Sequence, residues 1–218
     1  MYVKNFRELL AYIINVFKEK RFWFSIKYIF WCIWDRIRGV DYVKNESHNV
    51  LNTDAAESSV FQATRDIKYL KNVLDRLEIT DKDSILDLGS GKGYLLKVFA
   101  TDYDFRTVGG VEISSRLAEI SRKNLEKEGI GNFQIFNENA TTFYEYGGYN
   151  YIYMFNPFPS VVMKSVMKNI DPFVRGGGAM CIIYRNPVCH DDIINSGLFY
   201  LDKVFQGKTS DYYLYRSK

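Results

Sequence analysis

The sequence predicts an α/β protein: a Rossmann-like, seven-stranded, mostly parallel sheet with an antiparallel C-terminal strand pair, plus N-terminal helices. From Ser84 onward, short apolar runs alternate with helical patterns, which is typical of a parallel sheet with helices on both faces. Two final strand-like runs, Tyr200–Phe205 and Tyr212–Arg216, are joined by a Gly-Lys-Thr-Ser turn and predict the antiparallel pair. The 218 residues, 47% hydrophobic and 25% charged, suit one globular domain with a short extension.

Residues 1–59 are expected to form a helical extension or cap, and residues 60–218 the main domain. Two amphipathic helices are predicted on either side of a polar connection at residues 18–21, and Gly39 is expected to end the second. Their apolar stripes comprise Phe6, Leu9, Leu10, Ile13, Ile14 and Phe17, and then Phe22, Ile26, Ile29, Phe30, Ile33 and Ile37. After a polar stretch at Asn45–Ser59, a third helix is predicted at about Val60–Leu77.

Five parallel strands are predicted in the main domain, with helices between them. The strands are expected at Ser84–Leu88, Thr107–Glu112, Phe133–Asn137, Asn150–Phe155 and Ala179–Tyr184. The helices are expected at Tyr94–Ala100, Ser115–Glu128 and about Val161–Ile170. In such sheets ligands bind at the carboxyl ends of the strands, so the residues that follow each strand are the candidates for a site.

Composition narrows the class of protein. The cysteines, Cys32, Cys181 and Cys189, are odd in number and lack CxxC spacing, so no metal site is expected and reduced thiols predict a cytoplasmic protein. No secretory signal is visible, and the most apolar stretch, Tyr28–Trp34, is far shorter than a membrane span. A net charge of +3 gives no strong nucleic-acid signal.

A glycine-rich segment, Asp87-Leu88-Gly89-Ser90-Gly91-Lys92-Gly93, follows the first predicted strand and opens a helix. Glycine at these positions permits positive φ and close approach of the backbone to a ligand. Glu112 ends the next strand about twenty residues on, where an acid can accept hydrogen bonds from ribose hydroxyls. Asn139-Ala140 and Asn156-Pro157-Phe158 follow the third and fourth strands. The four segments together predict a nucleoside-containing ligand.

Three interpretations of the glycine segment compete. A phosphate-binding P-loop requires Ser or Thr after its lysine, but Lys92 is followed by Gly93. A dinucleotide-binding loop requires a small third residue where this chain has Tyr94, and Asp87 would repel a pyrophosphate. A turn without a ligand leaves the position of Glu112 unexplained. S-adenosylmethionine carries a sulfonium and an ammonium against one carboxylate, so an acid beside it is favourable.

These motifs resemble those of class I S-adenosylmethionine-dependent methyltransferases, from about Val60 to the C-terminus. The string Asp-Leu-Gly-Ser-Gly-Lys-Gly is similar to that of a group of small bacterial members. The resemblance implies S-adenosylmethionine as the cofactor. It implies cofactor contacts from Asp87, Gly89, Ser90, Gly91, Gly93, Glu112, Ile113, Asn139 and Ala140.

In that family the acid at the position of Glu112 binds both ribose hydroxyls, and the residue at Ile113 lies against the adenine. Most members have Asp where this chain has Asn139, whose amide oxygen can still accept a hydrogen bond from the adenine amino group. The alternative for Asn139 is a turn residue after a strand.

The segment Asn156-Pro157-Phe158 resembles the Asn-Pro-Pro-Phe/Tyr motif of members that methylate amines, but it lacks the second proline. Asn156 is therefore the candidate catalytic residue, with a proline-capped strand end as the alternative. Since methyl transfer from a sulfonium requires a base only when the nucleophile arrives protonated, His190, Tyr184 and Glu145 are weaker candidates for a base.

The sequence thus predicts methyl transfer to an N or O nucleophile of an unidentified small-molecule, glycan, lipid-linked or protein acceptor. A non-catalytic S-adenosylmethionine-binding module is the alternative, and a nucleotide-dependent reductase is less favoured. Residues 1–40 carry an excess of Lys and Arg among aromatic residues, which fits either a peripheral membrane contact or a cap over the site. The cap is favoured, because Lys27 and Arg36 lie close to the apolar stripe. The oligomeric state is not predicted.

Overall fold

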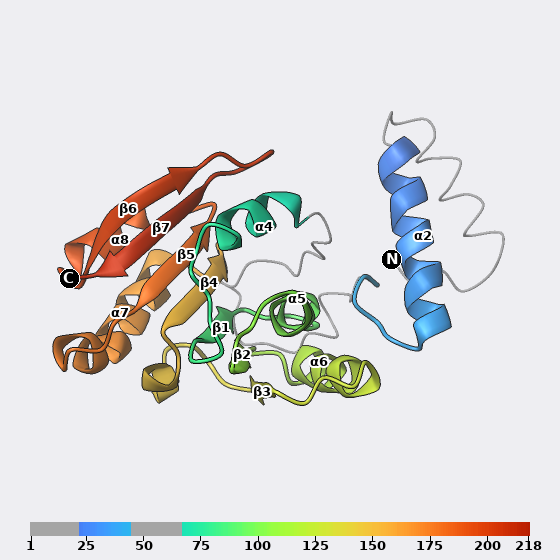
Figure 1. The fold of residues 1–218 in the computed structure, drawn as a ribbon, viewed down its shortest axis with the longest axis horizontal. Coiled ribbons are helices and arrows are strands. Elements are labelled where there is room, and N and C mark those ends of the chain that lie inside the picture. The colour runs from blue at the N-terminus through green and yellow to red at the C-terminus, as the bar shows by residue number, and fades with distance from the viewer. Residues whose placement is uncertain (1–21, 45–66) are drawn as a thin grey trace.

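A computed structural model describes residues 22–44 and 67–218 and has a seven-stranded sheet in the order β3-β2-β1-β4-β5-β7-β6 (Figure 1). The five parallel strands are β1 Ser84–Leu88, β2 Thr107–Val111, β3 Phe133–Phe136, β4 Tyr151–Phe155 and β5 Cys181–Arg185. β7, Tyr212–Ser217, runs antiparallel to β5, and β6, Phe199–Phe205, runs antiparallel to β7. The predicted fold class is confirmed.

β1 lies at the centre of the parallel strands, between β2 and β4. Asp87 of β1 pairs in register with Gly110 on one side and with Tyr153 on the other. The chain runs outward from β1 through β2 to β3 and then returns to place β4 on the other side. In sheets with such a change of direction, ligands usually bind at the carboxyl ends of the central strands.

Helices cover both faces of the sheet (Figure 1). α4 Lys68–Leu74, α5 Tyr94–Asp102 and α6 Ser115–Lys127 lie on one face, and α7 Ser160–Arg175 and α8 His190–Asn195 lie on the other. Alternation along β1 divides the core accordingly, because Ile85 packs with the first group and Leu86 with the second. Burial on both faces explains why the strands read as apolar runs.

Several predicted boundaries differ from the structure by one or two residues, and three differences are larger. The helix expected to end near Ile170 continues to Arg175, because Val174 extends its buried stripe past Pro172. The short helix α8 and the 3-10 turn at Glu145–Gly148 were not predicted. The third helix appears in the described residues only as Lys68–Leu74. The first predicted helix, the loop at 45–59 and residues 60–66 lie outside the described residues.

The N-terminal helix α2, Phe22–Arg38, stands at the end of the molecule opposite β6 and β7 (Figure 1). It ends as predicted at Gly39, whose φ is +68°. Its inner face packs on a small apolar cluster, and much of its apolar stripe is exposed to solvent. The cluster comprises Tyr28, Trp31, Cys32, Val40, Tyr42, Val43 and Tyr94. Within the described residues, no helix combines the length and apolar character that crossing a membrane requires.

Candidate functional site

The glycine loop leaves β1 after Leu88 and turns into α5. Gly89, Gly91 and Gly93 all have positive φ, at +84°, +54° and +80°. A Cβ at Gly89 would lie 2.9 Å from Cβ of Pro157, and one at Gly93 would lie 2.2 Å from Oγ of Ser121. The loop therefore requires glycine for its backbone conformation, as the sequence predicted, and also for its close packing against Pro157 and Ser121.

Glu112 connects this loop to the next helix. Its Oε2 accepts a hydrogen bond from the backbone N–H of Gly91 at 2.9 Å, and its Oε1 accepts one from the N–H of Ser114 at 2.9 Å. Burial raises the pKa of Glu112, and these N–H donors oppose the shift. Each carboxylate oxygen keeps a further lone pair, so the group can still accept hydrogen bonds from a ligand.

Asp87 is the second buried acid of the site. Burial and the nearby charge of Glu112 raise its pKa to about 8, and in the described residues no hydrogen bond reaches its carboxyl group. A cationic ligand would stabilise the ionised carboxylate. The Ser90 hydroxyl is also buried without a hydrogen-bond partner there, but it faces Gly110 beneath the loop. We therefore expect Ser90 to meet a ligand through its main chain.

The residues that follow β2 and β3 lie at the same edge of the sheet. Ile113 is half-buried, and the side chain of Asn137 donates to the carbonyl oxygens of Glu112 at 2.9 Å and Ile113 at 3.1 Å. Sequence reasoning missed this role of Asn137. The Oδ1 of Asn139 accepts from both the N–H and the hydroxyl of Thr141, each at 2.9 Å. Asn139 thus acts as a turn residue, which was the alternative predicted from the sequence. Its contact with adenine stays a proposal.

β4 and β5 end in the same way, and this similarity was not predicted from the sequence. Each strand is followed by Asn-Pro, and Asn156 and Asn186 have positive φ, at +40° and +52°. Non-glycine residues rarely adopt this conformation, and it is often found at functional sites. Because Pro157 lies against Gly89, the Asn156 turn is adjacent to the glycine loop. The repeated Asn-Pro pair after two apolar runs was the signal that could have identified Asn186.

Beside these turns, Arg185 ends β5 with its guanidinium carbon 4.2 Å from the ring centroid of Phe155. Its further hydrogen bonds go to the hydroxyls of Ser210 and Thr209, both at 3.4 Å. The carboxyl edge of β4 and β5 therefore presents a cation on an aromatic ring next to the Asn156 turn. Nothing in the sequence pattern singled out Arg185.

The three candidate bases do not gather at this edge. The turn that contains Glu145 leads into the start of β4, so Glu145 lies at the amino end of that strand. The prediction that Glu145 could serve as a base is therefore wrong. Tyr184 is fully buried, and burial raises its pKa well above the usual range, so it is a poor proton acceptor. The Nδ1 of His190 lies 2.8 Å from the hydroxyl of Tyr215 on the α8 side of the sheet.

Lys92 is the most unexpected residue of the loop. Its side chain is 1% exposed, and its Nζ lies 2.9 Å from Oδ1 of Asp41 and 2.6 Å from the carbonyl oxygen of Lys44. These contacts were not predicted from the sequence. Both contacts lie in the segment that follows α2.

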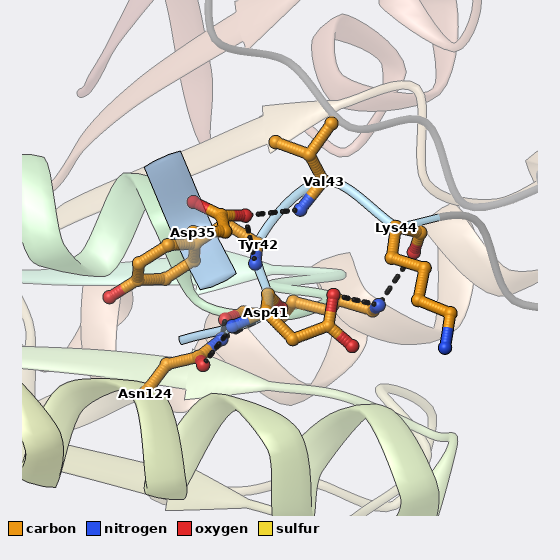
Figure 2. A network of polar contacts seen from close by, with 7 residues as sticks. Asp35, Asp41, Tyr42, Val43, Lys44 and Asn124 are labelled. Atoms are coloured by element: carbon orange, nitrogen blue, oxygen red, sulfur yellow. Dashed lines mark hydrogen bonds and ion pairs between the residues drawn. The ribbon is translucent and has the colours of Figure 1, made fainter. Parts of the chain in front are cut away.

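The same segment, residues 40–44, is held from two further sides (Figure 2). Asn124 of α6 accepts from the N–H of Asp41 at 2.8 Å and donates to its carbonyl oxygen at 3.0 Å. The buried carboxylate of Asp35 accepts from the N–H groups of Tyr42 at 2.8 Å and Val43 at 3.1 Å. We call residues 40–44 the brace, because they join α2, α6 and the glycine loop.

A family model for protein-L-isoaspartate(D-aspartate) O-methyltransferase matches residues 33–182, which include the brace, the glycine loop, Glu112 and the Asn156 turn. A curated rRNA adenine N-6-methyltransferase from Lysinibacillus sphaericus is 24% identical over 102 residues, which make up 47% of this chain and 40% of that protein.

Solved structures share the fold. A mutant of MtNAS in complex with S-adenosylmethionine has a TM-score of 0.55 and 22% identity, covering 68% of this chain and 60% of that one. An RNA methyltransferase from Salinibacter ruber in complex with S-adenosyl-L-homocysteine has a TM-score of 0.55 and 15% identity, covering 72% and 94%. The chain therefore spans less than two thirds of the rRNA methyltransferase and of MtNAS.

Proposed function

This chain belongs to the protein-L-isoaspartate(D-aspartate) O-methyltransferase family, and we propose that it transfers a methyl group from S-adenosylmethionine to an N or O nucleophile. The acceptor is a small molecule, a glycan, a lipid-linked molecule or a protein. Within this proposal the chain is one of the small bacterial members with the Asp87–Gly93 motif. Residues 60–218 form its catalytic domain and residues 1–59 an extension.

The contact between Glu112 and the glycine loop is the observation that carries the proposal. The hydrogen bond from the Gly91 N–H to Oε2 of Glu112 supports a shared role of the loop and the acid in binding one ligand. Glu112 then binds the ribose hydroxyls, and Asp87 binds the ammonium group of the methionine part. Ile113, Asn139 and Ala140 border the adenine. Two buried acids beside the glycine loop suit a net cationic nucleoside better than a pyrophosphate.

The bound cofactor supplies a methyl group on a sulfonium, which is a good leaving group. What the chain must do is align the nucleophile with that methyl group and exclude water. Asn156 has the position for the first task, because its turn lies against the glycine loop. Its side-chain oxygen or amide group orients an acceptor amine or hydroxyl. A general base is required only for a nucleophile that arrives protonated.

The test is the affinity for S-adenosylmethionine measured by calorimetry. Glu112→Ala removes two hydrogen bonds to a charged acceptor, so we expect a loss of about 2–4 kcal/mol, or roughly thirty- to a thousandfold in affinity. Unchanged affinity in a folded Glu112→Ala protein would refute the cofactor site. Circular dichroism establishes folding, and Glu112→Gln serves as a second variant that keeps the side-chain volume.

Two controls sharpen this test. Glu119→Ala removes an exposed acid from α6, and we expect its affinity to equal that of the wild type. NAD should bind no better than nonspecifically, because Asp87 disfavours a pyrophosphate. Tight NAD binding that Glu112→Ala abolishes would instead support a nucleotide-dependent reductase. Binding without transfer to any acceptor fraction would support a non-catalytic module.

A further inference from the structure

The outer face of α2 carries an apolar stripe that is exposed in the part of the chain that the structure describes. Its members recur at three- and four-residue spacings on one side of the helix. They are Ile26, 42% exposed, Phe30, 59%, Ile33, 54%, Trp34, 47%, and Ile37, 73%. The rings of Phe30 and Trp34 stack with centroids 6.1 Å apart, so the aromatic part of the stripe is continuous.

Basic residues border this stripe on both sides. At the angular spacing of an α-helix, Lys27 and Arg38 project beside Trp34, and Arg36 projects beyond Ile33. All three are exposed, and Arg38 also contacts Glu128 of the main domain at 3.0 Å. The long side chains can reach past the stripe while their charges stay in a polar layer.

The acid of α2 faces the other way. Asp35 is 5% exposed, and its carboxylate accepts the N–H groups of Tyr42 and Val43 in the brace. Trp31 also lies on this inner side, within the small cluster. The brace thereby fixes the rotation of α2 about its axis. The outer face, from residue 26 to residue 38, combines apolar and basic side chains with no exposed acid.

We propose that the outer face of α2 docks the protein on an anionic lipid surface. The stripe enters the boundary between headgroups and acyl chains, and Lys27, Arg36 and Arg38 meet the headgroups. The closeness of Lys27 and Arg36 to the stripe, which favoured a cap on sequence alone, is the arrangement this docking requires. The brace then holds the glycine loop at a constant distance from the membrane.

Charge argues for a membrane rather than a second copy of this chain. A two-fold pairing of α2 helices would bring like charges together along both borders of the stripe, and the described outer face offers no acid to neutralise them. An anionic lipid surface supplies the missing negative charge.

The tryptophans make the test specific, because all three, Trp23, Trp31 and Trp34, lie in α2. The full chain is mixed with vesicles of phosphatidylcholine, with and without phosphatidylglycerol. We expect cosedimentation and a blue shift of tryptophan emission only with the anionic vesicles. Brominated acyl chains should quench this emission, and high salt should release the protein.

Matched variants separate the stripe from its borders. Phe30→Ser together with Ile37→Ser should abolish binding, whereas Val188→Ser, at a residue 70% exposed elsewhere, should not. Lys27→Gln and Arg36→Gln should each weaken binding to anionic vesicles about fivefold. Lys203→Gln, on exposed β6, is the control for net charge. Affinity for S-adenosylmethionine should stay unchanged in all of them.

Three results would overturn the proposal. The first is no binding of the folded wild-type chain to anionic vesicles. The second is equal loss of binding in the stripe and control variants. The third is a stable dimer, seen by sedimentation, that Phe30→Ser with Ile37→Ser dissociates, because this would assign the stripe to self-association. Since cofactor affinity is measured on the same proteins, failure here is distinguishable from failure of the proposed function.

Discussion

Replacing Lys92 by Met should loosen the brace and lower the stability of the protein. The substitution keeps most of the side-chain volume but removes the Nζ that contacts Asp41 and the carbonyl oxygen of Lys44. A hydrogen bond to a charged group contributes about 1.5–3 kcal/mol. The side chain of Asp41 is 35% exposed, so solvent screens its ion pair, and we expect a total loss of about 2–3 kcal/mol.

Thermal unfolding gives the first measure of this loss. For a chain of this size, 1 kcal/mol corresponds to about 2–4 °C, so the Tm should fall by roughly 4–12 °C. Hydrogen exchange locates the change, because the N–H groups of Tyr42 and Val43 in the brace donate hydrogen bonds to the carboxylate of Asp35 in α2. Both should exchange faster in Lys92→Met, whereas amides of the central strands should change less.

A double-mutant cycle of Lys92→Met with Asp41→Ala isolates the pair. We expect a coupling free energy of about 1–2 kcal/mol, since each single change removes the same contact. The matched control is the exposed pair Lys123 and Glu119 on α6, whose coupling should be several-fold smaller. Lys123→Met should change neither the Tm nor the exchange rates of the amides in the brace. If Lys92→Met also leaves both unchanged, the buried lysine does not hold the brace.

Three further predictions concern the site itself. Burial and the charge of Glu112 raise the pKa of Asp87 from 3.8 to about 8, so binding of the cationic cofactor near pH 7 should release a proton, and the affinity should rise between pH 6 and 8. Calorimetry in buffers of different ionisation enthalpy measures this proton release. Asp87→Asn should remove both the proton release and the pH dependence of the affinity. The same shift makes the unfolding free energy fall as pH rises from 3.8 to about 8, since the unfolded chain has already lost the proton. Asn156→Ala should lower turnover about a hundredfold and change cofactor affinity only a few-fold, whereas unfolding with unchanged activity per folded molecule would make Asn156 a structural cap.

Local pattern was sufficient for the parallel strands and for the glycine loop. Apolar runs identified β1 and β4, and glycine spacing identified the loop, because these features depend on neighbours in the chain. The ends of the elements were less accurate. β5 runs to Arg185 because it pairs with Tyr212 of a later strand, and α7 runs to Arg175 because the far side of Val174 is buried.

By itself, the sequence determined the fold class, the glycine loop and the acid at Glu112, since each is encoded by spacing along the chain. Only the tertiary structure decided the role of Lys92, whose partner Asp41 lies 51 residues away. The tertiary structure also decided which side of α2 is exposed. Both sides carry aromatic residues, and the contacts of Asp35 and Trp31 with the rest of the protein bury one side and leave the other in solvent. Periodicity gives the faces of a helix, but long-range hydrogen bonds and burial select the face that meets solvent.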